Sequence, residues 1–150
     1  MLFRSKFIDI APEEFAAYRL NKGDLLFNRT NSIEHVGKTG LFDLDGDYCF
    51  ASYLVRIVPN LSEIKPEFLE LMINADEFQT QAKAAAVRSI NQANISAGKM
   101  RNMEVPIPDP DEQERLWVEI ETHAKRRQEA EAILAAAPAE KRKILLDGIR

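Results

Sequence analysis

A well-marked helix start after residue 108 constrains the fold of this chain more than any other sequence feature. Asp109 can serve as the N-cap, Pro110 suits the first helical position, and Glu112 lies three residues after the cap, as in a capping box. The pattern predicts a helix that continues to about Ala136. At 1.5 Å per residue, such a helix is about 40 Å long, which exceeds the width of a small domain.

This helix start divides the 150 residues into two predicted parts. Residues 1–108 are expected to form a compact domain of mixed α and β structure, and residues 109–150 a helical region that Pro138 breaks. The predicted fold class is α+β, with a long coiled-coil-type helix at the C-terminal end. Apolar side chains near heptad spacing mark an assembly face on this helix: Leu116, Trp117, Ile120, Ala124, Ile133 and Leu134. Alternatively, this face packs on the chain's own segment 144–149, with Pro138 as the bend.

Short apolar runs between turn signals predict the strands of the compact domain. Leu25–Phe27 follows the turn residues Gly23-Asp24 and is expected to be a buried strand. Asp45-Gly46 predicts a type I′ hairpin turn. The other expected strands are an edge strand at Phe7–Ile10 with Leu2-Phe3, a strand at Val36–Phe42, and one at Tyr48–Val58 that is rich in aromatic and β-branched residues.

Helical spacing dominates two other segments of the compact domain. Pro12–Leu20 predicts a short helix. After Pro66, apolar residues recur at spacings of three and four, Phe78 extends this stripe, and Ala82–Val87 continues it. Ser89–Gly98 is expected to be a polar loop. Val105–Pro108 is expected to be extended, because a residue that precedes proline avoids the helical region.

The charge of the chain is unevenly distributed. The formal net charge of −4 argues against a nucleic-acid binder if it is taken alone. However, residues 78–103 contain no acidic residue, and Lys83, Arg88, Lys99 and Arg101 lie within them. A locally positive surface affects binding more than the total charge does, so nucleic acid remains a candidate partner.

Three short motifs suggest chemistry but lack required residues. Gly37-Lys38-Thr39 is similar to the end of a phosphate-binding P-loop, but Ser32 stands where the first glycine is needed. The acidic residues at 43–47 suggest a calcium loop, but Leu54 stands where the bidentate glutamate should be. The segment 59–65 suggests a nuclease site without its first carboxylate.

Metal, redox and cofactor chemistry find no further support in the sequence. His35 and His123 are far apart, and the single Cys49 lies in an apolar run, which suits a core residue in a reducing cytoplasm. No G-x-G sequence and no apolar run of membrane-spanning length is present. We therefore expect no catalytic residue, no metal, no cofactor and no membrane partner.

Polar and basic side chains remain as the candidate binding residues. Arg and Lys pair with phosphates and guanine, and Asn and Gln match the adenine edge, so these residue types suit double-stranded DNA. The alternative is that they are ordinary turn and loop residues. The candidate DNA-binding residues are Arg29, Thr30, Asn31, Lys38, Arg88, Asn91, Gln92, Asn94, Lys99 and Arg101.

An ordered set of segments resembles the specificity subunits of bacterial type I restriction–modification systems. These segments are Gly23–Arg29, Val36–Thr39, Ala51–Ile57, Asn91–Ser96, Val105–Pro108 and Glu112-Gln113. The resemblance covers roughly residues 18–135 and implies one target-recognition domain with its spacer helix. In that family the domain binds one half of a bipartite DNA site, and the long helices form an antiparallel coiled coil.

The resemblance also implies partners. Methyltransferase and restriction subunits dock on the family's specificity subunit and carry out methylation and cleavage, which implies that this chain is a non-catalytic, cytoplasmic protein. Family members usually have two recognition domains, whereas one is recognisable here, so a homodimer formed through the C-terminal helix would supply the second. The competing interpretation is a protein-interaction or regulatory relic that has kept the fold and lost DNA binding.

Overall fold

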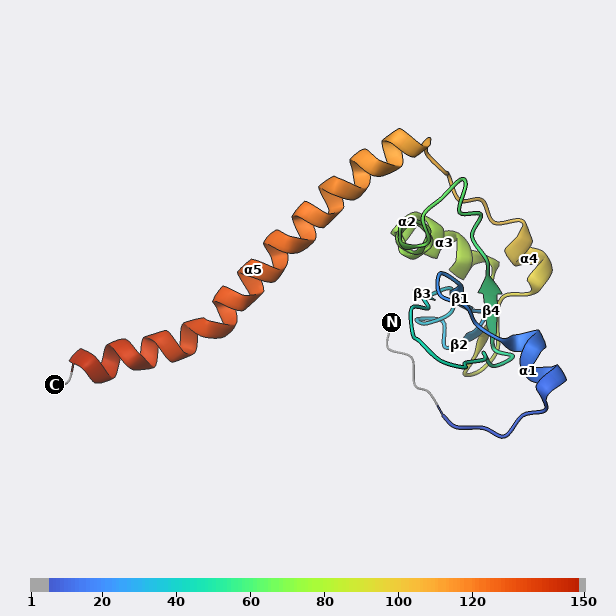
Figure 1. The fold of residues 1–150 in the computed structure, drawn as a ribbon, viewed down its shortest axis with the longest axis horizontal. Helices are drawn as coiled ribbons and strands as arrows, with labels where there is room; N and C mark the ends of the chain where they lie inside the picture. The colour runs from blue at the N-terminus through green and yellow to red at the C-terminus, as the bar shows by residue number, and fades with distance from the viewer. Residues whose placement is uncertain (1–5, 149–150) are drawn as a thin grey trace. The chain divides into compact units, whose positions relative to one another are not determined.

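The computed structural model describes residues 6–148 of the chain, except for the side chains of residues 140 and 143–148. The chain divides into two compact units, Met1–Pro108 and Asp109–Arg150. The first unit contains helices and two small antiparallel sheets, and the second is a single long helix, so the predicted α+β class is confirmed (Figure 1).

The central sheet has the strand order β3-β1-β4. Strand β1 (Leu25–Asn28) lies in the middle and pairs antiparallel with β3 (Thr39–Leu41) and with β4 (Leu54–Ile57). Because neighbouring side chains of a strand point to opposite faces, β1 is buried on both faces. Leu26 packs with Leu20 and Phe42 on one face, while Leu25 and Phe27 are fully buried on the other. The predicted buried strand is therefore confirmed.

The hairpin predicted at Asp45-Gly46 is wrong, because β3 and β4 lie on either side of β1 and do not pair with each other. A type I′ turn needs positive φ at both central residues, and only Gly46 has it, at +127°. Two aromatic residues of the predicted strand Tyr48–Val58 instead pack on the core: Tyr48 and Phe50 lie against the cluster around Leu26. The aromatic residues of this segment therefore indicate burial in the core and not strand pairing.

Several predicted strand bounds also differ from the structure. Residues 33–37 form a turn, so the strand predicted at Val36–Phe42 is reduced to β3. The strand predicted at Tyr48–Val58 is reduced to β4, with a turn at residues 52–53. Phe7–Ile10 is irregular and pairs with no strand, while Leu2-Phe3 lies outside the described residues.

The helices of this unit are α1 (Pro12–Tyr18), α2 (Pro66–Asn74), α3 (Asp76–Ala85) and α4 (Ala97–Arg101). The predicted continuous helix after Pro66 is two helices, because Ala75 is extended, with φ −64° and ψ 151°. The buried Gln79 pairs with a backbone carbonyl at the C-terminal end of α2. Its Nε2 donates a hydrogen bond of 2.8 Å to the Ile73 carbonyl. A polar side chain from the second helix thus stabilises the break between the two.

Helix α2 lies against β3 and caps the outer edge of this strand. The Asn74 side chain accepts a hydrogen bond from the Thr39 N–H at 3.1 Å and donates one to the Thr39 carbonyl at 2.9 Å. The Leu41 N–H donates to Glu70 Oε1 at 3.1 Å. An open sheet edge would expose unpaired backbone groups, and these side chains satisfy those groups on β3.

A second small sheet joins distant parts of the chain in the order β2-β6-β5. Its strands are β2 (Thr30–Asn31), β5 (Val87–Arg88) and β6 (Ala93–Asn94). The helix predicted to continue through Val87 therefore ends at Ala85, and the predicted polar loop Ser89–Gly98 contains β6 and the start of α4. Ile95 within that segment is fully buried, whereas the residues of a simple polar loop would be exposed to solvent.

Helix α5 (Pro110–Gly148) starts where the sequence predicts, and the Glu112 N–H donates to Asp109 Oδ1 at 3.0 Å. The Glu112 carboxylate accepts hydrogen bonds from Arg115, at 2.8 Å from Nε and 2.6 Å from Nη2. These hydrogen bonds lower the pKa of Glu112 below its ordinary value.

The predicted break of the helix at Pro138 is wrong, because α5 continues through this residue to Gly148. Proline removes a single backbone hydrogen bond, and it can kink a helix without ending it. The flanking residues 135–137 and 139 are alanine, the strongest helix former. The alternative, in which segment 144–149 folds back over a bend at Pro138, is wrong for residues 144–148, because they continue α5, and residue 149 lies outside the described residues. Within the described residues, no helix is both long and apolar enough to cross a membrane.

Gly37 has less room for a side chain than Gly23, Gly46 or Gly98. Its φ of +90° lies in the left-handed region, and a Cβ added to it would meet the Ala82 Cβ at 2.9 Å. Both the conformation and the close approach of α3 therefore require glycine there.

Replacing Gly37 with alanine should lower the free energy of unfolding by about 2–4 kcal/mol, since left-handed strain and overpacking add. Gly98 is the matched control, because it lies in α4 and the nearest atom to an added Cβ is Ser96 Oγ at 4.0 Å. Gly98→Ala should be neutral or stabilising by up to about 1 kcal/mol. Urea unfolding measures both variants, and equal midpoints for the two would contradict this account of Gly37.

Candidate nucleic-acid interface

The segment Gly37-Lys38-Thr39 has no backbone donors left for a phosphate. The N–H of Gly37 donates to the Asn28 carbonyl at 2.8 Å, and that of Lys38 donates to the His35 carbonyl at 3.2 Å. The N–H of Thr39 donates to Asn74 Oδ1 at 3.1 Å. A P-loop holds phosphate with such N–H groups at the start of a helix, whereas strand β3 follows here. This motif is therefore a structural turn.

The buried Gln79 holds that turn in place, and sequence reasoning missed it. Its Nε2 donates to the Gly37 carbonyl at 2.9 Å, and Thr39 Oγ1 donates to the same carbonyl at 3.2 Å. A glutamine on an otherwise apolar helix face was the available signal, since Gln79 lies one residue after Phe78. Lys38 is thereby fixed on the exposed side of a rigid turn.

Arg29 follows directly after β1, next to the point where this strand meets Lys38. The Asn28 N–H donates to the Lys38 carbonyl at 3.0 Å, so Asn28 and Lys38 lie opposite each other at the end of β1. Arg29 is half-buried, with its N–H donating to the Tyr53 carbonyl at 3.2 Å and its carbonyl accepting from the Ile95 N–H at 2.9 Å. The backbone of Arg29 thus joins the central sheet to the segment after β6.

Arg29 and two residues near it in sequence carry buried polar atoms without a partner. Among the described residues, four buried side-chain atoms have no hydrogen-bond partner: Asn28 Oδ1, Arg29 Nε, Ser32 Oγ and Gln79 Oε1. Each such atom costs about 1–3 kcal/mol if it stays unpaired. Arg29 as a whole is only half-buried, and an arginine that keeps part of its side chain exposed is suited to a phosphate or to a guanine edge.

The register of the second sheet separates the predicted residues between its two faces. Thr30 pairs with Asn94 and Asn31 with Ala93, so the members of each pair share a face. Arg88 pairs with Ala93 and therefore lies on the face of Asn31. Asn94 Nδ2 donates to Thr30 Oγ1 at 2.7 Å, which ties the strands together on the other face.

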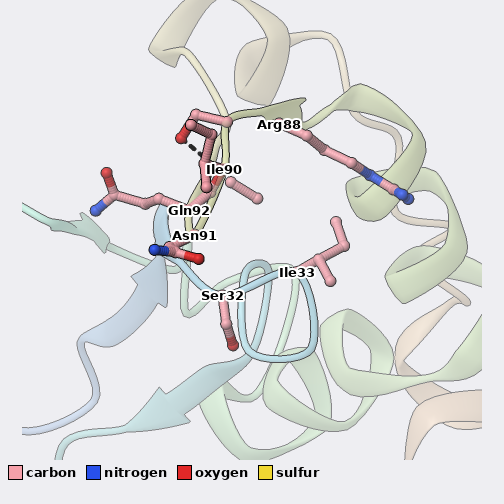
Figure 2. Close-up of a pocket in the computed structure, with 8 residues that line it drawn as sticks. Ser32, Ile33, Arg88, Ile90, Asn91 and Gln92 are labelled. Atoms are coloured by element: carbon pink, nitrogen blue, oxygen red, sulfur yellow. Dashed lines mark hydrogen bonds between the residues drawn. The ribbon is translucent and has the colours of Figure 1, made fainter.

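The turn between β5 and β6 projects beside a hollow of about 300 Å³. Figure 2 shows Ser32 and Ile33 on one side of this hollow and the turn residues Ile90 and Asn91 on the other. Gln92 also lies on the turn, and in this view its side chain extends to the side opposite that of Arg88. Polar side chains from residues 32 and 88–92, distant in sequence, thus surround one shallow depression.

Two of the predicted basic residues lie on α4. The Lys99 ammonium donates to the Ala85 carbonyl at 2.8 Å, where it caps the C-terminal end of α3. Arg101 is exposed in the last turn of α4. Lys99 therefore has a structural partner within the protein.

The acidic motifs form no metal centre in the described part of the chain, which contains no group of three potential metal-ligating side chains. Asp45 forms an ion pair of 2.7 Å with Lys22, and Asp47 forms one of 3.2 Å with Arg19. Glu63 accepts a hydrogen bond of 2.9 Å from the Asn60 amide. These carboxylates are engaged with residues of the protein itself.

The fold and this polar surface define a candidate nucleic-acid interface. Residues 6–134 match the family described as the type I restriction modification DNA specificity domain. The chain is also 30% identical, over 100 residues, to a protein of Methanocaldococcus jannaschii whose name describes it as the specificity subunit of the type I restriction enzyme MjaX. That alignment covers 66% of this chain and 24% of the relative. The chain belongs to the type I restriction–modification DNA specificity domain family.

The bond between Asn94 and Thr30 should stabilise the second sheet without any ligand. In a double-mutant cycle of Asn94→Ala and Thr30→Val, the coupling free energy should be about 1 kcal/mol in favour of the native pair. Asn91→Ala, at the exposed turn, should change the free energy of unfolding by less than about 0.5 kcal/mol. Chemical denaturation measures each variant, and additive effects of the two substitutions would show that the bond contributes nothing.

Proposed function

We propose that this chain is a sequence-specific DNA-recognition component of a type I restriction–modification system and that it binds one half of a bipartite site. The observation that carries the proposal is the half-buried Arg29, which directly follows β1 and is held there by backbone hydrogen bonds with Tyr53 and Ile95. Family membership supports double-stranded DNA as its ligand. The acid-free segment 78–103, which contains β5, β6 and α4, favours an approach by phosphates.

In this proposal the chain recognises DNA and catalyses no reaction itself. The turn at Gly37 has its N–H groups engaged, and Asp45 and Asp47 form ion pairs with Lys22 and Arg19. Methylation and cleavage would then be carried out by methyltransferase and restriction subunits that dock on this chain. The competing function, a protein-interaction or regulatory relic, is favoured by the net charge of −4 and requires that DNA does not bind.

Binding to random-sequence duplex DNA tests the proposal. Affinity should fall linearly on a logarithmic scale as salt concentration rises, because phosphate contacts release counterions. Arg29→Ala should weaken binding by about 1–3 kcal/mol. The control is Lys22→Ala, which removes the same charge from a residue that is paired with Asp45. Fluorescence anisotropy at several salt concentrations measures these effects.

Two results would contradict the proposal. Salt-independent or undetectable binding by the parent chain would favour the protein-interaction alternative. Equal affinities of Arg29→Ala and Lys22→Ala would show that only general charge matters and that Arg29 is not part of the binding site.

We further propose that α5 is the assembly element and that two copies of the chain pair through it in antiparallel orientation. Its 39 residues correspond to about 58 Å of helix. Ile133 is 70% exposed and Leu134 is 72% exposed, while Ile120 is 37% exposed. Ala124 is also exposed, and Leu116 and Trp117 are half-buried. Exposed apolar side chains on one helix are typical of an interface, and a two-fold pairing would supply a second recognition domain.

Charge on this apolar stripe should disrupt the proposed dimer. The double change Ile120→Asp with Leu134→Asp should give a folded monomer with weaker DNA binding, because half of the bipartite contact is lost. Val118→Asp is the control, since Val118 is 54% exposed but lies away from the stripe. Sedimentation at several concentrations measures the mass. A parent chain that stays monomeric at high concentration would assign the stripe to another subunit.

A further inference from the structure

The tip of the β5–β6 hairpin carries an apolar side chain that the protein itself does not use. The Ser89 N–H donates to the Gln92 carbonyl at 2.7 Å, which leaves Ile90 and Asn91 as a two-residue turn. Ile90 is 98% exposed. Burial of an isoleucine normally stabilises a protein by removing its side chain from water, so this one contributes nothing to the core of the chain.

The hairpin is held rigidly, so Ile90 is presented in a fixed position. The Ser89 hydroxyl donates a second hydrogen bond to the Gln92 carbonyl at 3.1 Å. Strand β6 pairs with β2 on its other side, and the fully buried Ile95 that follows β6 donates its N–H to the Arg29 carbonyl at 2.9 Å. The tip therefore lies at the end of a sheet that is anchored to the core, which lowers the entropy lost on binding.

The side chains around Ile90 match one kind of base pair. Asn91 is exposed beside it, and an asparagine side chain can bond the N6 and N7 atoms of adenine in two places. The partner base of adenine is thymine, whose C5-methyl group is the apolar feature of the major groove. A two-stranded ribbon fits into this groove, whereas the minor groove is narrower and shows no methyl group.

We propose, resting on the DNA-recognition function proposed above, that this turn reads an A·T-containing step in the major groove. Ile90 packs against the C5-methyl of a thymine, and Asn91 bonds an adenine edge at the same step. Ile90 is then a specificity-determining residue, and the half-site of this chain contains a thymine whose methyl group contributes to affinity. The hollow beside Ile33 and Ser32 accommodates the neighbouring sugar–phosphate backbone.

Replacement of thymine by uracil removes that methyl group alone and therefore tests the contact. The best-bound duplexes are first selected from a random pool with the parent chain, and each thymine is then replaced singly. One replacement should weaken binding by the parent about fourfold, the value expected for burial of one methyl group. Ile90→Ala should bind the original duplex about fourfold more weakly and should bind the thymine and uracil duplexes equally.

Val87→Ala provides the matched control on the same hairpin, because Val87 is also exposed, at 62%, but lies away from the tip. It should keep the sensitivity to uracil. If the parent binds duplexes but no replacement weakens binding, or if Ile90→Ala remains equally sensitive, the inference is overturned and the proposed function stands. If the parent shows no salt-dependent binding at all, both fail, and Ile90 is then assigned to a protein contact.

Discussion

The burial of β1 on both faces is the constraint on which the rest of the recognition unit depends. Leu26 fixes the strand to one apolar layer, and Leu25 and Phe27 fix it to the other, so its position cannot shift by one residue without exposing them. Because β1 cannot slip, its last residue Asn28 always meets Lys38, and Arg29 always emerges at the same point. The position of Arg29, a candidate DNA-binding residue, thus depends on the packing of the core.

Polar side chains within the unit act mainly on backbone groups. Gln79 holds the turn at Gly37, Asn74 and Glu70 satisfy the edge of β3, and Lys99 caps α3. These interactions leave the motif at Gly37 without free donors, which is a physical reason to interpret the unit as a rigid scaffold. A scaffold of this kind suits recognition, since a fixed surface loses little entropy when it binds.

Specificity and assembly are divided in this proposal between two parts of one chain. The recognition surface depends on loops held by two small sheets, while α5 provides length and an exposed apolar stripe. The net charge of −4 is compatible with DNA binding because basic residues concentrate in the acid-free segment 78–103. Phosphate contacts from that segment would give affinity, and base contacts from the hairpin turn would give sequence preference.

Local signals alone determined the start of α5 and the buried strand β1. An N-cap with a following proline, and a short apolar run after a Gly-Asp turn, act over a few neighbouring residues and can be recognised in sequence. Only the tertiary structure decided that β3 and β4 flank β1, that α2 and α3 are separate, and that Thr30 and Arg88 lie on opposite faces of one sheet. Strand pairing joins residues 64 positions apart, as Thr30 and Asn94 are, and such contacts depend on how the whole core packs.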